Sequence, residues 1–219
     1  MSKDRDLAAI EYEAFRLIEL GRQAPDRTVP QYPTWVLRDL VIHVAEVHGR
    51  TGAICETLPT ERISGPELPA EADPFDWAAE QLARMLEGLA MADPAAHVWT
   101  FVDDPSLGFW IRRMVVETGV HRWDAHSAVG KPVELLTTVS RHGLDEFTDL
   151  YLPRLGDVPT LELHATDLGR TWRFGSGEPE AVIEGEASDV FLRLMSRPGV
   201  ALPSSWEQAV DALGSPADR

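Results

Sequence analysis

The stretch that decides the fold is FWIRRMVVETGVHRWDAHSAVG, residues 109–130, which combines apolar and metal-binding side chains at helical spacing. We expect a helix over residues 106–129 whose inward face carries Trp110, Met114, Glu117, His121 and Ala125. Glu117 and His121 are four residues apart, so their Cβ atoms should lie roughly 5–6 Å from each other on that face. An ionisable side chain that points into the interior is costly unless it is paired or coordinated.

A second predicted helix carries the same combination of side chains. PTWVLRDLVIHVAEVHGR, residues 33–50, belongs to a helix expected from about residue 35 to 57, and His43 interrupts its apolar stripe. Metal sites in helical bundles are commonly built from facing helices of this kind. Two histidines and one glutamate also form a standard donor set for catalytic zinc, with a fourth position open. His43, Glu117 and His121 therefore predict a site for Zn2+, or for another divalent metal such as Ni2+.

Each of these residues also has a simpler interpretation. His43 alone fits a hydrogen-bonded core histidine, and E-x-x-x-H is a short pattern that is common on helix surfaces. Asp124 follows His121 by three residues. It is either an outer carboxylate that orients a ligand histidine or a solvated helix residue.

Three further side chains lie near the predicted ligands in sequence. His48 and His126 each follow a predicted ligand by five residues, about 140° further round a helix, so we expect them beside the site and not in it. Cys55 follows His43 by twelve residues, roughly 18 Å along a continuous helix, and is expected to be a buried small hydrophobe. The chain therefore offers this metal no thiol of its own.

The first part of the chain, residues 1–132, predicts a four-helix bundle. Apolar residues at helical spacing predict a helix around residues 7–18 that ends at Gly21, and Asp73 with Pro74 starts another. RTVPQYPTW, residues 27–35, is expected to be a loop broken by two prolines. With the two helices above, these segments give four amphipathic helices joined in the manner of a bundle.

The second part, residues 133–219, predicts a small α/β domain, so the fold class is α+β. A helix is expected over residues 137–155. TLELHAT (160–166), RTWRFG (170–175) and EAVIEG (180–185) are expected as short strands. ASDVFLRLMSR (187–197) and SSWEQAVDAL (204–213) are expected as closing helices.

The excess of acidic residues indicates which partners the protein is expected to bind. The chain has 20 Lys and Arg against 36 Asp and Glu, a formal net charge of -16, which disfavours nucleic acid and anionic membrane surfaces. It has no apolar run long enough for a membrane span, no apolar signal-peptide core, and a single cysteine. These features indicate a cytoplasmic protein with small-molecule partners.

The two quoted helices resemble a known family. Residues 33–50 resemble the W-x-x-x-D-L-x-x-H helix of the mycothiol-dependent maleylpyruvate isomerase family, and residues 109–130 resemble its E-x-x-x-H-x-W-D-A signature. GEASDVFLRLMSR, residues 185–197, resembles its C-terminal segment G-x-A-S-D-L-x-L-x-L-x-G-R. That family belongs to the DinB-like metalloprotein superfamily.

The resemblance implies a DinB-like bundle followed by a small α/β domain similar to sterol carrier proteins. It implies that His43, Glu117 and His121 are zinc ligands and that Arg197 acts near the substrate. The chain departs from the family pattern at two positions. Val36 stands where Ser or Thr often caps the helix, so we expect Thr34 to take over capping, and Ser196 stands where Gly is usual.

The resulting hypothesis is a zinc-dependent enzyme that activates a low-molecular-weight thiol, mycothiol, for addition to or transfer onto a small electrophilic substrate. Zinc favours the thiolate of a bound thiol, and the thiolate is the nucleophile. A substrate carboxylate would be held by Arg197, Arg112 or Arg113. Two alternatives are a metal-dependent hydrolase, with Asp124 as general base, and a non-enzymatic metal-stabilised small-molecule-binding protein.

Overall fold

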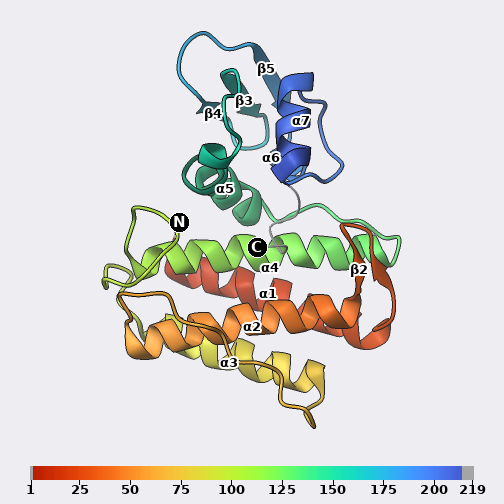
Figure 1. The fold of residues 1–219 in the computed structure, drawn as a ribbon, viewed down its shortest axis with the longest axis vertical. Helices are drawn as coiled ribbons and strands as arrows, with labels where there is room; N and C mark the ends of the chain where they lie inside the picture. The colour runs from red at the N-terminus through yellow and green to blue at the C-terminus, as the bar shows by residue number, and fades with distance from the viewer. Residues whose placement is uncertain (1, 214–219) are drawn as a thin grey trace. The chain divides into compact units, whose positions relative to one another are not determined.

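Four long helices make up the first of two units in this computed structural model, which describes residues 2–213. The units are Met1–Val133 and Glu134–Arg219. In the first, α1 (Lys3–Gln23), α2 (Leu37–Thr57), α3 (Pro74–Met91) and α4 (Leu107–Ala128) lie side by side (Figure 1). Each helix packs against two or more of the others, α2 on α3 and α4, and α1 on α3 and α4. The predicted four-helix bundle is therefore present.

Side chains cap the starts of two helices, and the cap of α3 was predicted from the sequence. The Asp73 carboxylate accepts hydrogen bonds from the backbone N–H groups of Phe75 and Asp76, both at 2.9 Å, and Pro74 occupies the first helical position. At α4 the Ser106 hydroxyl accepts from the Phe109 N–H at 3.3 Å. These caps satisfy donors that no helical carbonyl can reach.

Gly21, which we expected to end the first helix, lies inside α1. It is buried, and a Cβ atom at this position would come within 2.6 Å of the Val41 side chain on α2. The missing side chain therefore lets α1 and α2 approach closely, and the helix continues to Gln23.

The segment before α2 is a β-hairpin and not the loop that the prolines suggested. β1 (Thr28–Val29) pairs antiparallel with β2 (Tyr32–Val36), and Pro33 is tolerated because a two-stranded ribbon consists of edge strands. The prediction that Thr34 caps α2 was wrong, because Thr34 lies within β2. The Val36 N–H donates instead to the Asp39 carboxylate at 2.9 Å, so a residue inside the first turn closes the helix end.

α4 is buried along nearly its whole length and brings charged side chains into the interior. Arg122 is one of these, and it donates to both carboxylate oxygens of Glu13 on α1, a side chain with no exposed surface. Burial raises the pKa of Glu13, and the Arg122 guanidinium opposes that rise. The buried charge of Arg122 is therefore matched by a carboxylate on another helix.

The second unit is a three-stranded sheet with helices. β3 (Leu161–Ala165) is central, antiparallel to β4 (Arg170–Phe174) and parallel to β5 (Ala181–Gly185). α6 (Ala187–Leu194) and α7 (Ser204–Leu213) follow the sheet, and α5 (Thr137–Glu146) precedes it. The helix predicted over residues 137–155 changes type after α5, into a π-helical turn at Phe147–Tyr151 and a 3-10 turn at Leu152–Arg154. No helix within residues 2–213 is both long and apolar enough to cross a membrane.

The backbone at Ser196, where the family pattern quoted above has glycine, adopts a conformation that favours glycine. Its backbone φ is 62°, in the left-handed region that disfavours side chains with a Cβ atom. Its hydroxyl donates to the Val210 carbonyl at 2.9 Å, which offsets part of that strain. The turn before Arg197 therefore keeps the conformation that glycine would adopt.

We predict that Ser196→Gly and Ser196→Ala separate these two effects. Both variants lose the hydrogen bond, but only glycine relieves the left-handed backbone, so Ser196→Gly should be more stable than Ser196→Ala by about 1 kcal/mol. Urea unfolding followed by circular dichroism measures the difference. Equal stabilities of the two variants would show that the backbone here is unstrained.

Candidate metal centre

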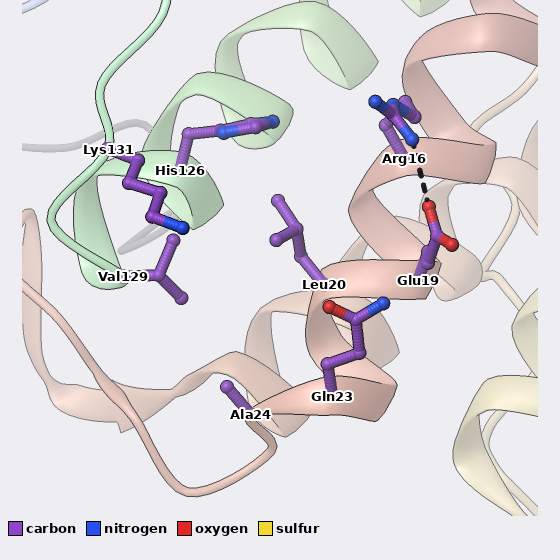
Figure 2. Close-up of a pocket in the computed structure, with 8 residues that line it drawn as sticks. All are labelled: Arg16, Glu19, Leu20, Gln23, Ala24, His126, Val129 and Lys131. Carbon is purple, nitrogen blue, oxygen red and sulfur yellow. Dashed lines mark hydrogen bonds and ion pairs between the residues drawn. The ribbon is translucent and has the colours of Figure 1, made fainter.

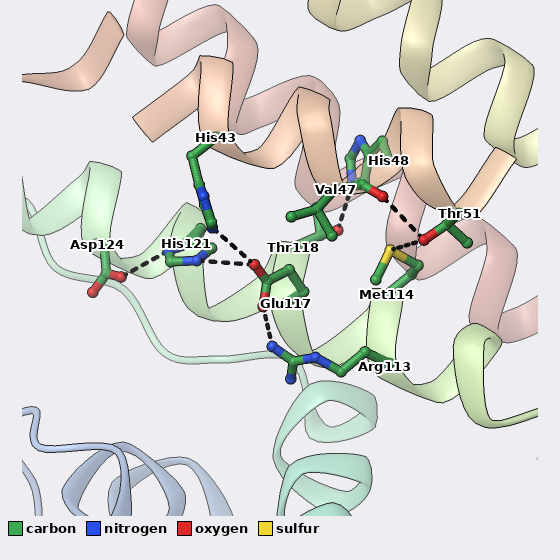
Figure 3. A network of polar contacts seen from close by, with 10 residues as sticks. All are labelled: His43, Val47, His48, Thr51, Arg113, Met114, Glu117, Thr118, His121 and Asp124. Atoms are coloured by element: carbon green, nitrogen blue, oxygen red, sulfur yellow. Dashed lines mark hydrogen bonds and ion pairs between the residues drawn. The ribbon is translucent and has the colours of Figure 1, made fainter. Parts of the chain in front are cut away.

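The three predicted ligands meet between α2 and α4. One donor atom from each of His43, Glu117 and His121 lies within 4.8 Å of the other two. Glu117 Oε1 is 3.2 Å from His43 Nε2 and 3.3 Å from His121 Nε2, as the dashed lines in Figure 3 show. Zinc bonds of about 2.0–2.1 Å in a tetrahedral site place neighbouring donors ~3.3 Å apart. The donor set therefore fits a zinc ion, and the assignment as ligands stays a prediction.

Two further charged groups contact the outer side of this cluster. Asp124 Oδ2 lies 3.1 Å from His121 Nδ1, on the opposite side of the imidazole from Nε2, and Asp124 is completely buried. Arg113 donates to Oε2 of Glu117, the oxygen that does not face the histidines. Asp124 thus sits where an outer carboxylate would turn the His121 Nε2 lone pair toward the cluster (Figure 3).

Aromatic rings from the hairpin cover the histidines. The Trp35 ring centroid lies 5.2 Å from that of His43, and the Tyr32 centroid lies 5.9 Å from that of His121. The two rings stack on each other at 4.8 Å. Sequence reasoning missed both residues, although Trp35 is the first position of the W-x-x-x-D-L-x-x-H pattern. The tryptophan and the histidine of this pattern are therefore in ring contact.

The electrostatics of the cluster suit a cation. Burial by itself would raise the pKa of Glu117, but Arg113, His121 and His43 hold it well below its usual range. Burial would likewise lower the pKa of His121, but Tyr32, Glu117 and Asp124 raise it to about 10. The residues of the cluster thus keep Glu117 ionised and favour an added positive charge next to it. A divalent cation would supply that charge in place of a proton.

Comparison with known proteins identifies the family of the chain. The family model described as mycothiol maleylpyruvate isomerase N-terminal domain matches residues 8–126, more than half of the chain. The chain belongs to this family. His43, Glu117 and His121 all lie within the matched residues.

Two solved structures share the fold. The chain is similar to a crystal structure of the mycothiol-dependent maleylpyruvate isomerase with a TM-score of 0.67 and 12% identity, over 88% of each chain. A histidine-to-alanine mutant of that enzyme gives the same TM-score, identity and coverage. At this identity the likeness shows the fold alone. A comparison with curated proteins found no match.

Within this family member, His48 lies outside the donor set, as expected. It is buried, and its Nε2 shares a hydrogen bond of 2.9 Å with the Thr118 hydroxyl. Burial lowers the pKa of His48 to about 4; Glu117 opposes this shift, and His43 and His121 add to it. His48 is therefore neutral at pH 7 and ties α2 to α4 next to the cluster (Figure 3).

The other sequence candidates have distinct environments. Burial raises the pKa of the Cys55 thiol to about 11, so it stays protonated at neutral pH. Arg112 is partly exposed and donates to Asp104 at 2.9 Å, whereas Arg113 is buried against Glu117. Arg197 belongs to the second unit, is 2% exposed, and donates to the Met195 carbonyl at 2.5 Å. Its role near the substrate stays a prediction.

A cavity of about 360 Å³ lies elsewhere in the bundle, between α1 and the end of α4 (Figure 2). His126 lines it together with Leu20 and Lys131, and an Arg16–Glu19 ion pair of 3.0 Å lies at its wall. None of the three predicted metal ligands lines this cavity. His126 lines this cavity and is not part of the His43–Glu117–His121 cluster, as expected.

We predict that Asp124→Asn weakens metal binding by about 10- to 100-fold, because the His121 ring loses the anion that orients it and raises its basicity. Competition with a chromophoric chelator measures the zinc affinity. Asp104→Asn, which removes an exposed carboxylate paired with Arg112, is the matched control and should bind zinc like the wild type. Equal affinities of all three proteins would contradict an orienting role of Asp124.

We also predict an acid-sensitive contribution from His48. Its folded-state pKa of about 4 lies below the ordinary value of 6.5, so the unfolded chain binds a proton first as the pH falls. Stability is therefore lost between about pH 6.5 and 4, by roughly 3 kcal/mol from this group alone. Urea unfolding of metal-free wild type and His48→Gln across this range measures it. The wild type should lose about that much more than the variant, and parallel pH profiles would contradict the prediction.

Proposed function

We propose that the chain is a zinc-dependent enzyme that activates mycothiol for addition to, or transfer onto, a small electrophilic substrate. The observation that carries this is the convergence of His43, Glu117 and His121 on one point, inside the segment that the family model matches. The family is named for an enzyme that isomerises maleylpyruvate with this thiol. An isomerase and a thiol S-transferase share the first step and both fall within the proposal.

The chain's own residues prepare the site for this chemistry. A bound zinc ion would favour the thiolate form of a thiol at its open position. Asp124 fixes the ring of His121, and Arg113 holds the second oxygen of Glu117. The Nε2 atom of His121 and the Oε1 atom of Glu117 are therefore kept pointing at the same place. Trp35 and Tyr32 shield the histidines on the hairpin side. A preorganised donor set of this kind needs little rearrangement during a reaction.

The thiol has to come from outside the chain. The single cysteine, Cys55, keeps its proton at neutral pH and lies more than three helical turns from His43 on α2. Neither feature suits a nucleophile at the metal centre. A separate low-molecular-weight thiol supports the reaction instead, and mycothiol is the one that the family's description prints.

The proposed isomerisation needs no oxidant or reductant. The thiolate sulfur gives its electron pair to a cis double bond conjugated to a carbonyl, and a carbon–sulfur bond forms. The former double bond is now single and rotates. Expulsion of the thiolate restores the double bond in the trans form and regenerates the thiol. In a transfer reaction the adduct instead gains a proton and leaves.

The structure offers little support to the hydrolase alternative. Hydrolysis would need a general base near the open metal position, and Asp124 was the nearby candidate. Asp124 is completely buried and lies against Nδ1 of His121, on the side of the ring that faces away from the other donors. It is therefore committed to orienting the histidine. This favours thiol chemistry over hydrolysis by a zinc-activated water.

The test combines metal content with thiol binding. We expect about one zinc ion per chain in the wild type and none in His121→Ala, measured by elemental analysis. His164→Ala is the matched control, because this histidine is partly exposed, pairs with Glu162 and is not one of the three predicted ligands. Titration of mycothiol into cobalt-substituted protein should produce a thiolate charge-transfer band.

The outcomes separate the candidate functions. Absence of metal from the wild type would refute the metal centre. A metal site that gives no thiol-dependent band would turn the assignment toward a hydrolase or a metal-stabilised binding protein. A band that is lost in His121→Ala and kept in His164→Ala supports the proposal, and turnover of maleylpyruvate with mycothiol then distinguishes isomerase from transferase.

A further inference from the structure

The two histidines of the cluster are held by different kinds of neighbour. The Nδ1 atom of His121 lies 3.1 Å from the Asp124 carboxylate, and the His121 side chain is only 5% exposed (Figure 3). His43 contacts Glu117 through Nε2 and is 23% exposed, and no hydrogen bond within residues 2–213 reaches its Nδ1 atom. A histidine ligand usually has its second nitrogen bound, which fixes the direction of its ring. His43 therefore needs another support.

A carboxylate at the corresponding place on α2 does not give this support. Glu46 follows His43 by three residues, the same interval that separates Asp124 from His121. Among the residues that the structure describes, no hydrogen bond or ion pair joins Glu46 to His43. Burial raises the pKa of Glu46, and His43 only partly opposes this rise. The same spacing on two helices therefore leads to two different arrangements.

The ring of Trp35 lies against His43 instead. The two ring centroids are 5.2 Å apart and the planes are inclined by 48°, within the range of aromatic rings in contact. Tyr32 stacks on Trp35 and also contacts His121, and the two histidines meet edge to face at 5.2 Å. The four rings thus form a closed circuit of contacts. A rotation of the His43 ring would disturb its contacts with both neighbours.

An irregularity in the hairpin brings Trp35 to this place. Val29 pairs with Tyr32 and Thr28 pairs with Val36, so β2 has three residues between the two pairs where β1 has none. In a regular strand, residues three apart point to opposite faces. Tyr32 and Trp35 nevertheless stack on each other at 4.8 Å. Extra residues of this kind bend a strand and redirect its side chains, often beside a functional site.

We propose that Trp35 is the positioning residue of His43, so that the affinity for Zn2+ depends on the ring of Trp35. This rests on the proposed function, because the cluster has to bind zinc. Trp35 acts by packing and not by charge: its ring limits rotation of the imidazole and keeps Nε2 directed toward Oε1 of Glu117, 3.2 Å away. Loss of the ring should therefore weaken the site although every ligand and every charge is retained.

Zinc affinities of substituted proteins test this role, by competition with a chromophoric chelator. We expect Trp35→Leu to bind zinc about 3- to 10-fold more weakly, and Trp35→Phe, which keeps a flat ring, to restore most of the affinity. Trp99→Leu is the matched control, because Trp99 is a half-buried tryptophan of the same unit whose ring contacts Phe101 and Trp110. This control and Glu46→Gln should bind zinc like the wild type.

Two further measurements separate positioning from a structural role. Urea unfolding of the metal-free proteins reports stability, and the d–d absorption of the cobalt-substituted proteins reports the geometry of the donors. A positioning role predicts a changed cobalt spectrum in Trp35→Leu that Trp35→Phe restores. Lower stability of Trp35→Leu with unchanged zinc affinity and an unchanged cobalt spectrum would overturn the inference. Weaker zinc binding in Glu46→Gln but not in Trp35→Leu would overturn it as well.

The cobalt–thiol band, measured on the same preparations, reports the proposed function independently. Wild-type zinc affinity of Trp35→Leu, with the thiol band intact, overturns the inference and leaves the function standing. Zinc affinity that depends on Trp35, without a thiol band, supports the inference and refutes the thiol chemistry. Absence of zinc from the wild type refutes both. If Trp35→Leu fails to fold, Trp35→Met decides: weaker zinc binding than in Trp99→Met supports the positioning role, and equal binding overturns it.

Discussion

The structure depends on the burial of one carboxylate. Glu117 lies inside a helical bundle, where an ionised group is tolerated only with charged or hydrogen-bonding partners around it. Those partners come from both helices: His43 and His121 face one oxygen, and Arg113 binds the other. His121 is itself held in place by a hydrogen bond between its Nδ1 atom and the Asp124 carboxylate. The result is a set of donors held in place before any ligand binds.

The rest of the bundle keeps this arrangement rigid. α4 is buried along nearly its whole length, so its inward charges cannot turn toward water, and Arg122 is matched by Glu13 on α1. Gly21 allows α1 to approach α2, and the bond between His48 and Thr118 ties α2 to α4 one turn from the cluster. The hairpin before α2 adds Tyr32 and Trp35 over the histidines. The contacts that pack the helices of this unit therefore also hold the three predicted ligands in position.

The bundle and the shared face of Glu117 and His121 could be predicted from spacing, because four residues along a helix return to the same face whatever the rest of the chain does. His43 was predicted to join them because it interrupts the apolar stripe of another helix of the bundle. The strands of the second unit followed from alternation and turn residues in the same way. Contacts between distant segments could not be predicted, since no residue near Glu13 in the sequence indicates a contact with Arg122. The hairpin that positions Trp35 was also missed, because two prolines in this segment favoured a loop. The residues before α2 do not reveal its cap, because the capping carboxylate of Asp39 lies inside the first turn of the helix. The metal assignment and the role of Arg197 stay predictions.

The pairing pattern of the arginines follows from the charge balance of the molecule. With a net charge of -16, most arginines find a carboxylate nearby, as Arg113, Arg122, Arg84 and Arg170 do. At physiological salt, charges are screened beyond about 8 Å, so the overall acidity neither attracts nor strongly repels a small anion at a distance. What decides the affinity for a small anion is therefore the local pairing of charges. Arg50 forms no ion pair with Glu46 one turn away, because its guanidinium lies against Phe101 and Trp110 instead. Of the charged groups around it, the Glu117 carboxylate has the largest effect on the pKa of Arg50, which it raises.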